Sequence, residues 1–193
     1  MRREEKKMQT NGLDLELLQG AMDVIREQPE AGIVTIRTLH RWDDGFAVDR
    51  YAKEVEEGSE VTARKFTFST DWPVEVGGRD SGPAPGEVLL GALGGCVAMT
   101  YITKAALRGI TIDELQVTIE ARVDLHGTFE LDSVRAGLSD VTITVGVRSD
   151  ADDAALEQLA QTTTRTSGVF DSLANPVPMQ LLVQRRHHSN VEG

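Results

Sequence analysis

The sequence predicts an α+β fold, in which runs of strands are separated by helices. Three observations predict it. Apolar and polar residues alternate over 33–70 and again over 110–150, apolar residues recur at helical spacing over 13–28, and an almost uncharged apolar segment occupies 87–109. The expected order is helix, three strands, buried helix, two strands, helix and strand. Helices of such unequal polarity favour α+β over a doubly wound parallel sheet.

The first part of the chain, 1–32, is predicted to be a charged tail followed by one amphipathic helix. Residues 1–11 are charged and show no periodicity, so we expect no regular structure there. The apolar residues of 13–28 recur every three or four positions, and they are Leu17, Leu18, Ala21, Val24 and Ile25. Pro29 and Gly32 then predict the end of the helix.

The main domain is predicted to span 33–185. Its first part, up to Thr70, predicts a three-stranded antiparallel meander, because short alternating runs are separated by Asp-Gly and Glu-Gly turns. The following segment, 71–86, has four glycines and three prolines and is predicted to be a loop. The helix over 87–109 is apolar on nearly every face, so we expect it to be covered on all sides.

Two more strands are predicted over 110–125 and 138–150 because their residues alternate in polarity. A second helix is expected to start near Asp150, with the carboxylates of its first turn favoured by the helix dipole. A closing strand is predicted over 179–186, and a short tail over 186–193 follows the domain.

Composition limits the function classes. The formal net charge of −11 repels phosphate backbones, so we expect no nucleic-acid partner. The apolar run between Glu87 and Lys104 is shorter than the roughly 20 residues that a membrane span needs. The chain has one cysteine and no apolar segment after its charged start, which favours a protein of the reducing cytoplasm.

Cys96 is the one candidate nucleophile, and it follows two glycines within the predicted helix. Gly94 and Gly95 each cost roughly 1 kcal/mol relative to alanine, so a close approach of another backbone or of a substrate is expected there. In the simpler interpretation they permit tight packing and Cys96 is a small buried hydrophobe. Because burial raises the pKa of a thiol, a reactive thiolate would need a nearby cation, for which Arg41 and Arg79 are the candidates.

The remaining polar and aromatic residues predict no further site. The four histidines have no metal-ligand spacing, so neither a metal nor another cofactor is expected; they are His40, His126, His187 and His188. Trp42 and Trp72 are expected in core or interface packing, with an apolar collar around a substrate as the alternative. Ser167 has no adjacent histidine to activate it and is expected to cap or turn the chain.

The segment SGPAPGEVLLGALGGCVAMTYITKAALRGITIDELQVTIEARVD, followed by SGVFDSLANPVPM, resembles the OsmC/Ohr family of osmotically inducible and organic hydroperoxide resistance proteins. The resemblance covers about 33–185, and the preceding helix is similar to an extension in one branch of OsmC-like proteins. It implies an OsmC-like fold, an intertwined homodimer and sites at the interface. It also implies that Cys96 is the peroxidatic cysteine, polarised by an arginine and a glutamate, for which Arg41 and Glu87 are the counterparts.

Two positions depart from the family pattern. Ser167 stands where the family has a second cysteine, and a hydroxyl cannot form a disulfide. The family's carboxylate lies ten residues before the cysteine, whereas Glu87 lies nine before Cys96. Ten helical residues leave two side chains about 80° apart and nine leave them about 180° apart. Glu87 is therefore equally well interpreted as a helix-start charge.

Two functions follow, and a structural dimer without chemistry is the third possibility. The first is a peroxidase in which Cys96 reduces an organic hydroperoxide and an external thiol resolves the sulfenic acid. The second is a non-catalytic binding module whose pocket holds a small apolar ligand.

Overall fold

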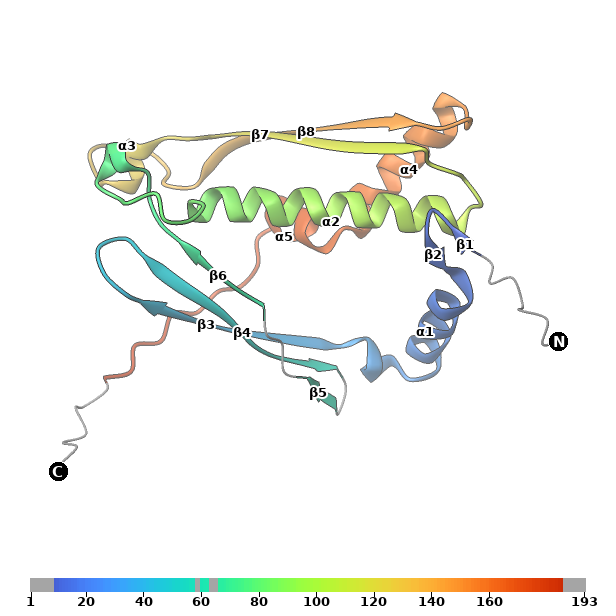
Figure 1. The fold of residues 1–193 in the computed structure, drawn as a ribbon, viewed down its shortest axis with the longest axis horizontal. Helices are drawn as coiled ribbons and strands as arrows, with labels where there is room; N and C mark the ends of the chain where they lie inside the picture. Colours follow the sequence, from blue (N-terminus) through green and yellow to red (C-terminus); the bar gives the residue numbers. More distant parts are fainter. Residues whose placement is uncertain (1–8, 58–59, 63–65, 186–193) are drawn as a thin grey trace.

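The computed structural model describes residues 9–57, 60–62 and 66–185. Figure 1 shows two layers joined only near their ends. In one layer, a long helix lies under a two-stranded sheet, with further helices beside it; the other layer is a separate antiparallel sheet. This arrangement agrees with the predicted α+β class.

A small hairpin precedes the first helix. Strand β1 (Gln9–Thr10) pairs with β2 (Leu13–Asp14), so the expectation of no regular structure over 1–11 is wrong for Gln9 to Asn11, and residues 1–8 lie outside the described part. The hairpin forms because Asn11 and Gly12 both adopt positive φ, as its two-residue turn requires, and the Asn11 side chain attaches it to the chain after the long helix by donating to the Ile110 carbonyl and accepting from the Ile112 N–H. Main-chain groups after the long helix are thereby satisfied.

Helix α1 (Leu15–Glu27) and a 3₁₀ turn, η1 (Pro29–Gly32), follow. Asp14 caps α1 by accepting a hydrogen bond from the Leu17 N–H, and the turn begins at the predicted proline. The amphipathic helix is thus confirmed. None of its residues is buried, and Leu17 is 74% exposed. Its apolar stripe therefore has no cover within the described chain.

The predicted meander is confirmed, with its third strand in two pieces. Strand β3 (Val34–Trp42) pairs antiparallel with β4 (Val48–Glu57). Two short strands, β5 (Glu60–Thr62) and β6 (Thr67–Thr70), pair with different parts of β4. The loop expected over 71–86 is confirmed except for a single 3₁₀ turn, η2 (Val74–Val76), and for the helix that begins at its end.

Helix α2 (Pro85–Leu107) is the long helix predicted around Cys96, and it begins two residues earlier than expected. Its five buried residues are Leu93, Val97, Tyr101, Ala105 and Ala106, while Leu89, Met99 and Leu107 are exposed. The prediction that α2 is covered on all sides is therefore wrong for a single chain. By length and composition, α2 fits a membrane span as well as a core helix. If α2 is a core helix, its exposed apolar residues must be covered by another chain.

The other face of α2 packs against a hairpin and two helices (Figure 1). Strands β7 (Glu114–Val123) and β8 (Leu138–Arg148) form the predicted antiparallel pair, linked through the short helix α3 (Leu125–Thr128). Helix α4 (Asp153–Thr166) starts at the predicted aspartates, with Asp152 as its cap, and α5 (Gly168–Ala174) follows one residue later.

The core is small and lies where α2 meets α4. It consists of Tyr101, Ala105 and Leu159, with half-buried apolar residues of β7 and β8 around them. The Tyr101 hydroxyl donates to the Leu156 carbonyl at 3.1 Å, so the only polar atom of this buried ring is satisfied.

The predicted closing strand is absent within the described residues. Residues 175–185 form no helix or strand, and Met179, Leu181 and Val183 are 94%, 91% and 89% exposed. An isolated strand cannot satisfy its own backbone groups, and this segment pairs with none of the strands in the described part of the chain. The end of the prediction, Arg186, and the tail after it lie outside the described residues.

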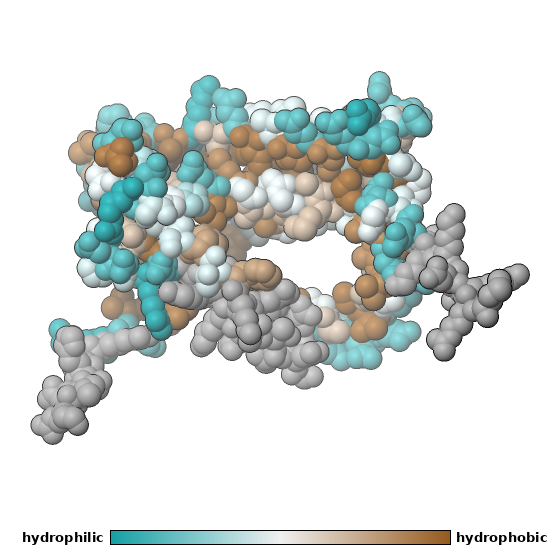
Figure 2. Space-filling model, in the orientation of Figure 1, coloured by the Kyte–Doolittle hydropathy of each residue, from teal (hydrophilic) through white to brown (hydrophobic). Residues whose placement is uncertain are grey.

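The chain exposes far more surface than a compact monomer does. Its accessible area is 15327 Å², against about 9,000 Å² for a compact protein of 21.0 kDa. The 21 residues outside the described ranges would account for at most about 3,300 Å² of this excess, the value for a fully extended chain. Figure 2 shows an opening through the molecule between the α2 layer and the lower sheet.

Candidate functional site

Cys96 lies in the middle of α2, and its sulfur faces the corner between α4 and α5. Ser167 is the one residue between these two helices and is fully buried. Its hydroxyl donates a hydrogen bond to the Cys96 Sγ at 3.2 Å. The corner thus brings together two residues that are 71 positions apart in the sequence.

This corner favours the thiolate form of Cys96. Burial raises the pKa of the Cys96 thiol, but four hydrogen bonds together lower it more, so that its pKa lies below the usual range. The donors are the Ser167 hydroxyl, the Val169 N–H, the Thr100 hydroxyl and the Gly168 N–H, in decreasing order of effect. Sequence reasoning expected burial to dominate unless a cation was nearby. In the structure, the four hydrogen bonds from neutral groups lower this pKa, and no cation is among the groups that lower it.

The two glycines before Cys96 differ in their surroundings. A Cβ atom added to Gly94 would lie 3.3 Å from the Ile119 side chain of β7, whereas one added to Gly95 would meet nothing within 4 Å. Gly94 therefore serves tight packing of α2 on the sheet, as the simpler interpretation held. Cys96 itself is half-buried and not a sealed core residue.

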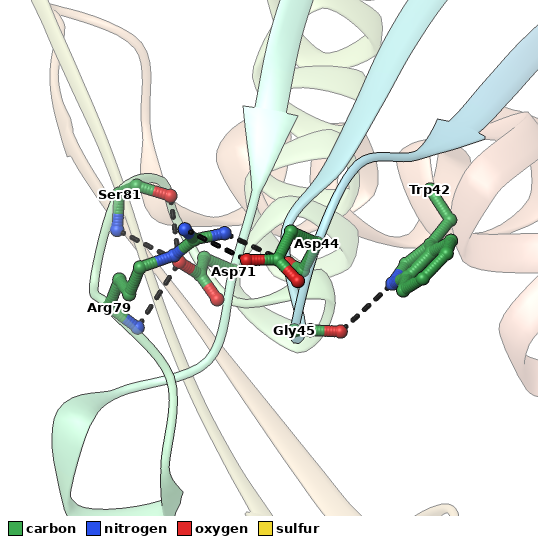
Figure 3. Close-up of polar contacts among 6 residues, drawn as sticks. All are labelled: Trp42, Asp44, Gly45, Asp71, Arg79 and Ser81. Carbon is green, nitrogen blue, oxygen red and sulfur yellow. Dashed lines mark hydrogen bonds and ion pairs between the residues drawn. The ribbon is translucent and has the colours of Figure 1, made fainter.

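Arg79 belongs to a different cluster, shown in Figure 3. Its guanidinium donates to the Asp44 carbonyl at 2.9 Å and lies 3.5 Å from an Asp44 carboxylate oxygen. The buried Asp71 carboxylate accepts from the Ser81 hydroxyl and from three backbone N–H groups, those of Trp72, Arg79 and Ser81. The Ser81 hydroxyl is the main reason that the pKa of Asp71 lies below its usual range. These bonds fix the loop that leads into α2.

The two tryptophans lie near the same loop. Trp72 stacks on Phe46 with ring centroids 5.0 Å apart and meets Phe129 edge-on at 5.4 Å. This is the predicted packing role, and it joins the β3–β4 turn to the loop after β7. Trp42 is 71% exposed, and its indole N–H donates to the Gly45 carbonyl, as Figure 3 shows.

The predicted carboxylate and the second predicted arginine lie away from Cys96 in the single chain. Glu87 accepts a hydrogen bond from the Ala84 N–H at 2.7 Å, which makes it a capping residue of α2. Nine helical residues also separate it from Cys96 by about 13 Å along the axis. Arg41 lies on β3, opposite Asp49, in the layer across the opening. Whether either acts on Cys96 of a second chain stays a prediction.

Two hollows adjoin this part of α2. A cavity of about 220 Å³ opens beside the sulfur and is lined by Cys96, Met99, Thr100, Thr103, Lys104 and Thr166. An apolar groove of about 270 Å³ lies on the other side of α2, between β8 and the helices α4 and α5. Sequence reasoning missed Lys104 and Thr100 as neighbours of Cys96, although their spacing of eight and four residues along a helix predicts one shared face.

The comparisons with known proteins identify the family of the chain. The family model described as OsmC-like protein matches residues 78–182, which is more than half of the chain and includes α2, Cys96 and Ser167. The chain belongs to the OsmC-like protein family. No curated protein matches it.

Solved structures carry the same fold. An OsmC-like protein from Mycoplasma pneumoniae matches with a TM-score of 0.58 and 14% identity, over 74% of this chain and 89% of that one. An OsmC-like protein of unknown function from Vibrio cholerae matches with a TM-score of 0.51 and 9% identity, over 72% and 92%.

This OsmC-like protein therefore has a single cysteine, with a serine hydroxyl against it at the position where the resemblance implied a second cysteine. Of the histidines in the described ranges, His40 contacts Thr38 and His126 contacts Asp124. Within those ranges no three metal-ligating side chains come together.

Proposed function

We propose that this OsmC-like protein reduces organic hydroperoxides through Cys96 and relies on an external thiol to complete the cycle. One observation carries the proposal: the Cys96 sulfur receives hydrogen bonds that favour its thiolate and at the same time borders an open cavity. The thiolate is the nucleophile in peroxide reduction, so a depressed pKa and access from solvent are the two properties required.

The chemistry balances as follows. The Cys96 thiolate attacks the terminal oxygen of the hydroperoxide, the O–O bond breaks, and a proton completes the alcohol product. Cys96 leaves this step as a sulfenic acid, oxidised by two electrons. A first external thiol condenses with it to give a mixed disulfide and water. A second thiol attacks that disulfide, which releases the oxidised thiol pair and restores Cys96.

Ser167 holds the sulfur but cannot replace the missing thiol. Its hydroxyl stabilises the thiolate before the reaction. Because an oxygen atom forms no disulfide with the sulfenic acid, that intermediate must wait for a thiol from outside the chain. The single-cysteine cycle therefore depends on the concentration of external thiol at its second step.

We propose a homodimer as the working form. The excess exposed area, the uncovered face of α2 and the unpaired segment 175–185 each call for a second chain. Once the residues outside the described ranges are allowed for, about 3,000 Å² per chain, or about 6,000 Å² for a pair of chains, remains to be covered, which is at the upper end of obligate interfaces. In that assembly Arg41, on the exposed β3, is the arginine we assign to the partner's site.

The deciding experiment measures consumption of cumene hydroperoxide in the presence of a monothiol, for the wild type and for Cys96→Ser. We expect thiol-dependent turnover in the wild type only. A dimedone adduct at Cys96 after one equivalent of peroxide would identify the sulfenic acid by mass. Equal consumption by the two proteins would disprove the proposal.

The apolar groove between α2, β8 and α5 supports the alternative of a binding module. An apolar ligand that binds only the folded state raises the melting temperature. A rise of this kind with Cys96 unmodified, together with no peroxide turnover, would favour that alternative.

A further inference from the structure

The cavity beside Cys96 is lined by both the nucleophile and a cation. Four of its lining residues, Cys96, Thr100, Thr103 and Lys104, lie on one face of α2, and Thr166 closes it from the end of α4. Eight helical residues separate Cys96 from Lys104, or about 12 Å along the axis. The cavity is therefore a trench that leads from a sulfur to an ammonium group.

Lys104 is the only charged residue of the trench. Among the described residues no carboxylate forms an ion pair with it. The chain as a whole has a net charge of −11, so this ammonium group places a local positive charge at the far end of the trench from the sulfur. Within the single chain it is available to a negatively charged ligand.

The hydroxyls of the trench cannot replace this cation. Thr103 donates to the Met99 carbonyl and Thr166 to the Thr162 carbonyl, both at 2.8 Å. Their hydrogens are therefore occupied within the helices, and their oxygens are left to accept. Of these three side chains, only Lys104 has donors free for a carboxylate.

We propose that the trench binds the resolving thiol and selects a small thiol that carries a carboxylate. The inference rests on the proposed function, because it names the reductant of that same site. The carboxylate binds Lys104, and the thiol reaches the Cys96 sulfenic acid, where it forms the mixed disulfide and releases water. Ser167 makes such a ligand necessary, since the chain has no thiol of its own for this step.

The spacing also sets the kind of thiol. The flexible lysine side chain covers part of the distance along α2, and the ligand must cover the rest. Several bonds must therefore separate its thiol from its carboxylate. A tripeptide thiol such as glutathione has this separation and serves as the probe. Its monoethyl and diethyl esters carry the same thiol with one and two fewer negative charges.

The experiment measures how fast each of the three thiols forms the mixed disulfide, per thiolate present, after one equivalent of cumene hydroperoxide. In the wild type we expect glutathione to be fastest and the diethyl ester slowest. Lys104→Gln should slow glutathione about two- to fivefold, as expected for one solvent-accessible ion pair, and should reduce the preference among the three. Lys104→Arg should restore most of the preference for glutathione.

Arg122→Gln is the matched control, because it removes one exposed positive charge from β7, near the opposite end of α2. It should leave the preference unchanged. A wild type without preference, or a preference that survives Lys104→Gln, would overturn the inference.

The trench can also be tested if the proposed function is wrong. If peroxide gives no sulfenic acid at Cys96, the same series is measured on Cys96 carrying a 5-thio-2-nitrobenzoate group, which an incoming thiol displaces with a colour change. The rank order of the three thiols then tests the trench alone.

Discussion

Replacing Ser167 with cysteine should give this chain the intramolecular step that it lacks. The Ser167 oxygen lies 3.2 Å from the Cys96 sulfur, and a disulfide needs about 2.0 Å between sulfur atoms. The longer carbon–sulfur bond covers part of the difference of about 1.2 Å, and small side-chain rotations can cover the rest. We therefore expect Ser167→Cys to form an intrachain disulfide with Cys96 on treatment with one equivalent of peroxide.

The structure also sets the size of the effect. The bond would close a loop of 71 residues, for which the loss of chain entropy in the unfolded state corresponds to about 4 kcal/mol. For a protein of this size that amounts to a difference of about 10 °C in melting temperature between the oxidised and reduced forms.

The assay follows peroxide consumption and free thiols together. We expect Ser167→Cys to lose two thiols for each peroxide and to turn over with a dithiol reductant. The wild type should instead lose one thiol and form mixed disulfides with a monothiol. Ser172→Cys is the matched control, since Ser172 is exposed on α5 and its hydroxyl bonds the Gly168 carbonyl, away from Cys96.

One result would refute this reasoning. If Ser167→Cys keeps both thiols after peroxide treatment, or behaves like Ser172→Cys, then the α4–α5 corner does not hold position 167 against Cys96 in solution.

Four further predictions concern the same elements. Ser167→Ala removes a hydrogen bond to a half-exposed thiolate, a loss of about 1 kcal/mol after allowance for solvent. The pKa of Cys96 should therefore rise, and about fivefold less thiolate should react with iodoacetamide below that pKa. An unchanged pH profile of this reaction would contradict the role of Ser167. Ile36→Glu puts a charge on the exposed apolar face of β3, and sedimentation should then find single chains where the wild type forms pairs; equal masses would count against the dimer. Tyr101→Phe leaves the Leu156 carbonyl without its donor and should lower the free energy of urea unfolding by about 1 kcal/mol, whereas no loss would mean that water replaces the hydroxyl. Gly78→Ala would place a Cβ 1.7 Å from the Trp72 carbonyl oxygen and should destabilise the loop strongly. Gly20→Ala has open space around it in α1 and should stabilise the protein by about 0.5–1 kcal/mol. Similar melting temperatures for the two variants would show that the loop rearranges freely.

The three longest helices, α1, α2 and α4, and most strands were predictable because their signals are local, whereas the short helices α3 and α5 were not predicted. Asp152 marks the start of α4 through its own side chain, and the apolar spacing before Pro29 marks α1. The meander follows from alternation and from turn residues, which neighbouring positions determine.

The environment of the sulfur was not predictable in this way. The contact between Ser167 and Cys96 joins residues 71 positions apart, and no period or motif encodes it. The sequence located the nucleophile, but three of the four donors that lower its pKa come from residues 167–169 at the α4–α5 corner, whose placement depends on tertiary packing. Lys104 lies on the same helix as Cys96, so helix geometry alone predicts that the two residues share one side of α2.

The closing strand was predicted over 179–186 but is absent from the described residues, for a different reason. Residues 179–185 have the apolar composition of a strand, but strand formation needs an edge to pair with, and the described chain supplies none there. A sequence pattern indicates that a segment can form a strand, but it does not indicate which chain supplies the neighbouring strand.

The uncovered face of α2 has a consequence for the life of the protein in the cell. In the proposed dimer, each newly made chain exposes its longest apolar helix until it meets a second copy, so the yield of native protein depends on how fast copies meet. Melting temperature should then increase with protein concentration, and dilute chains should be the first to be degraded or to aggregate.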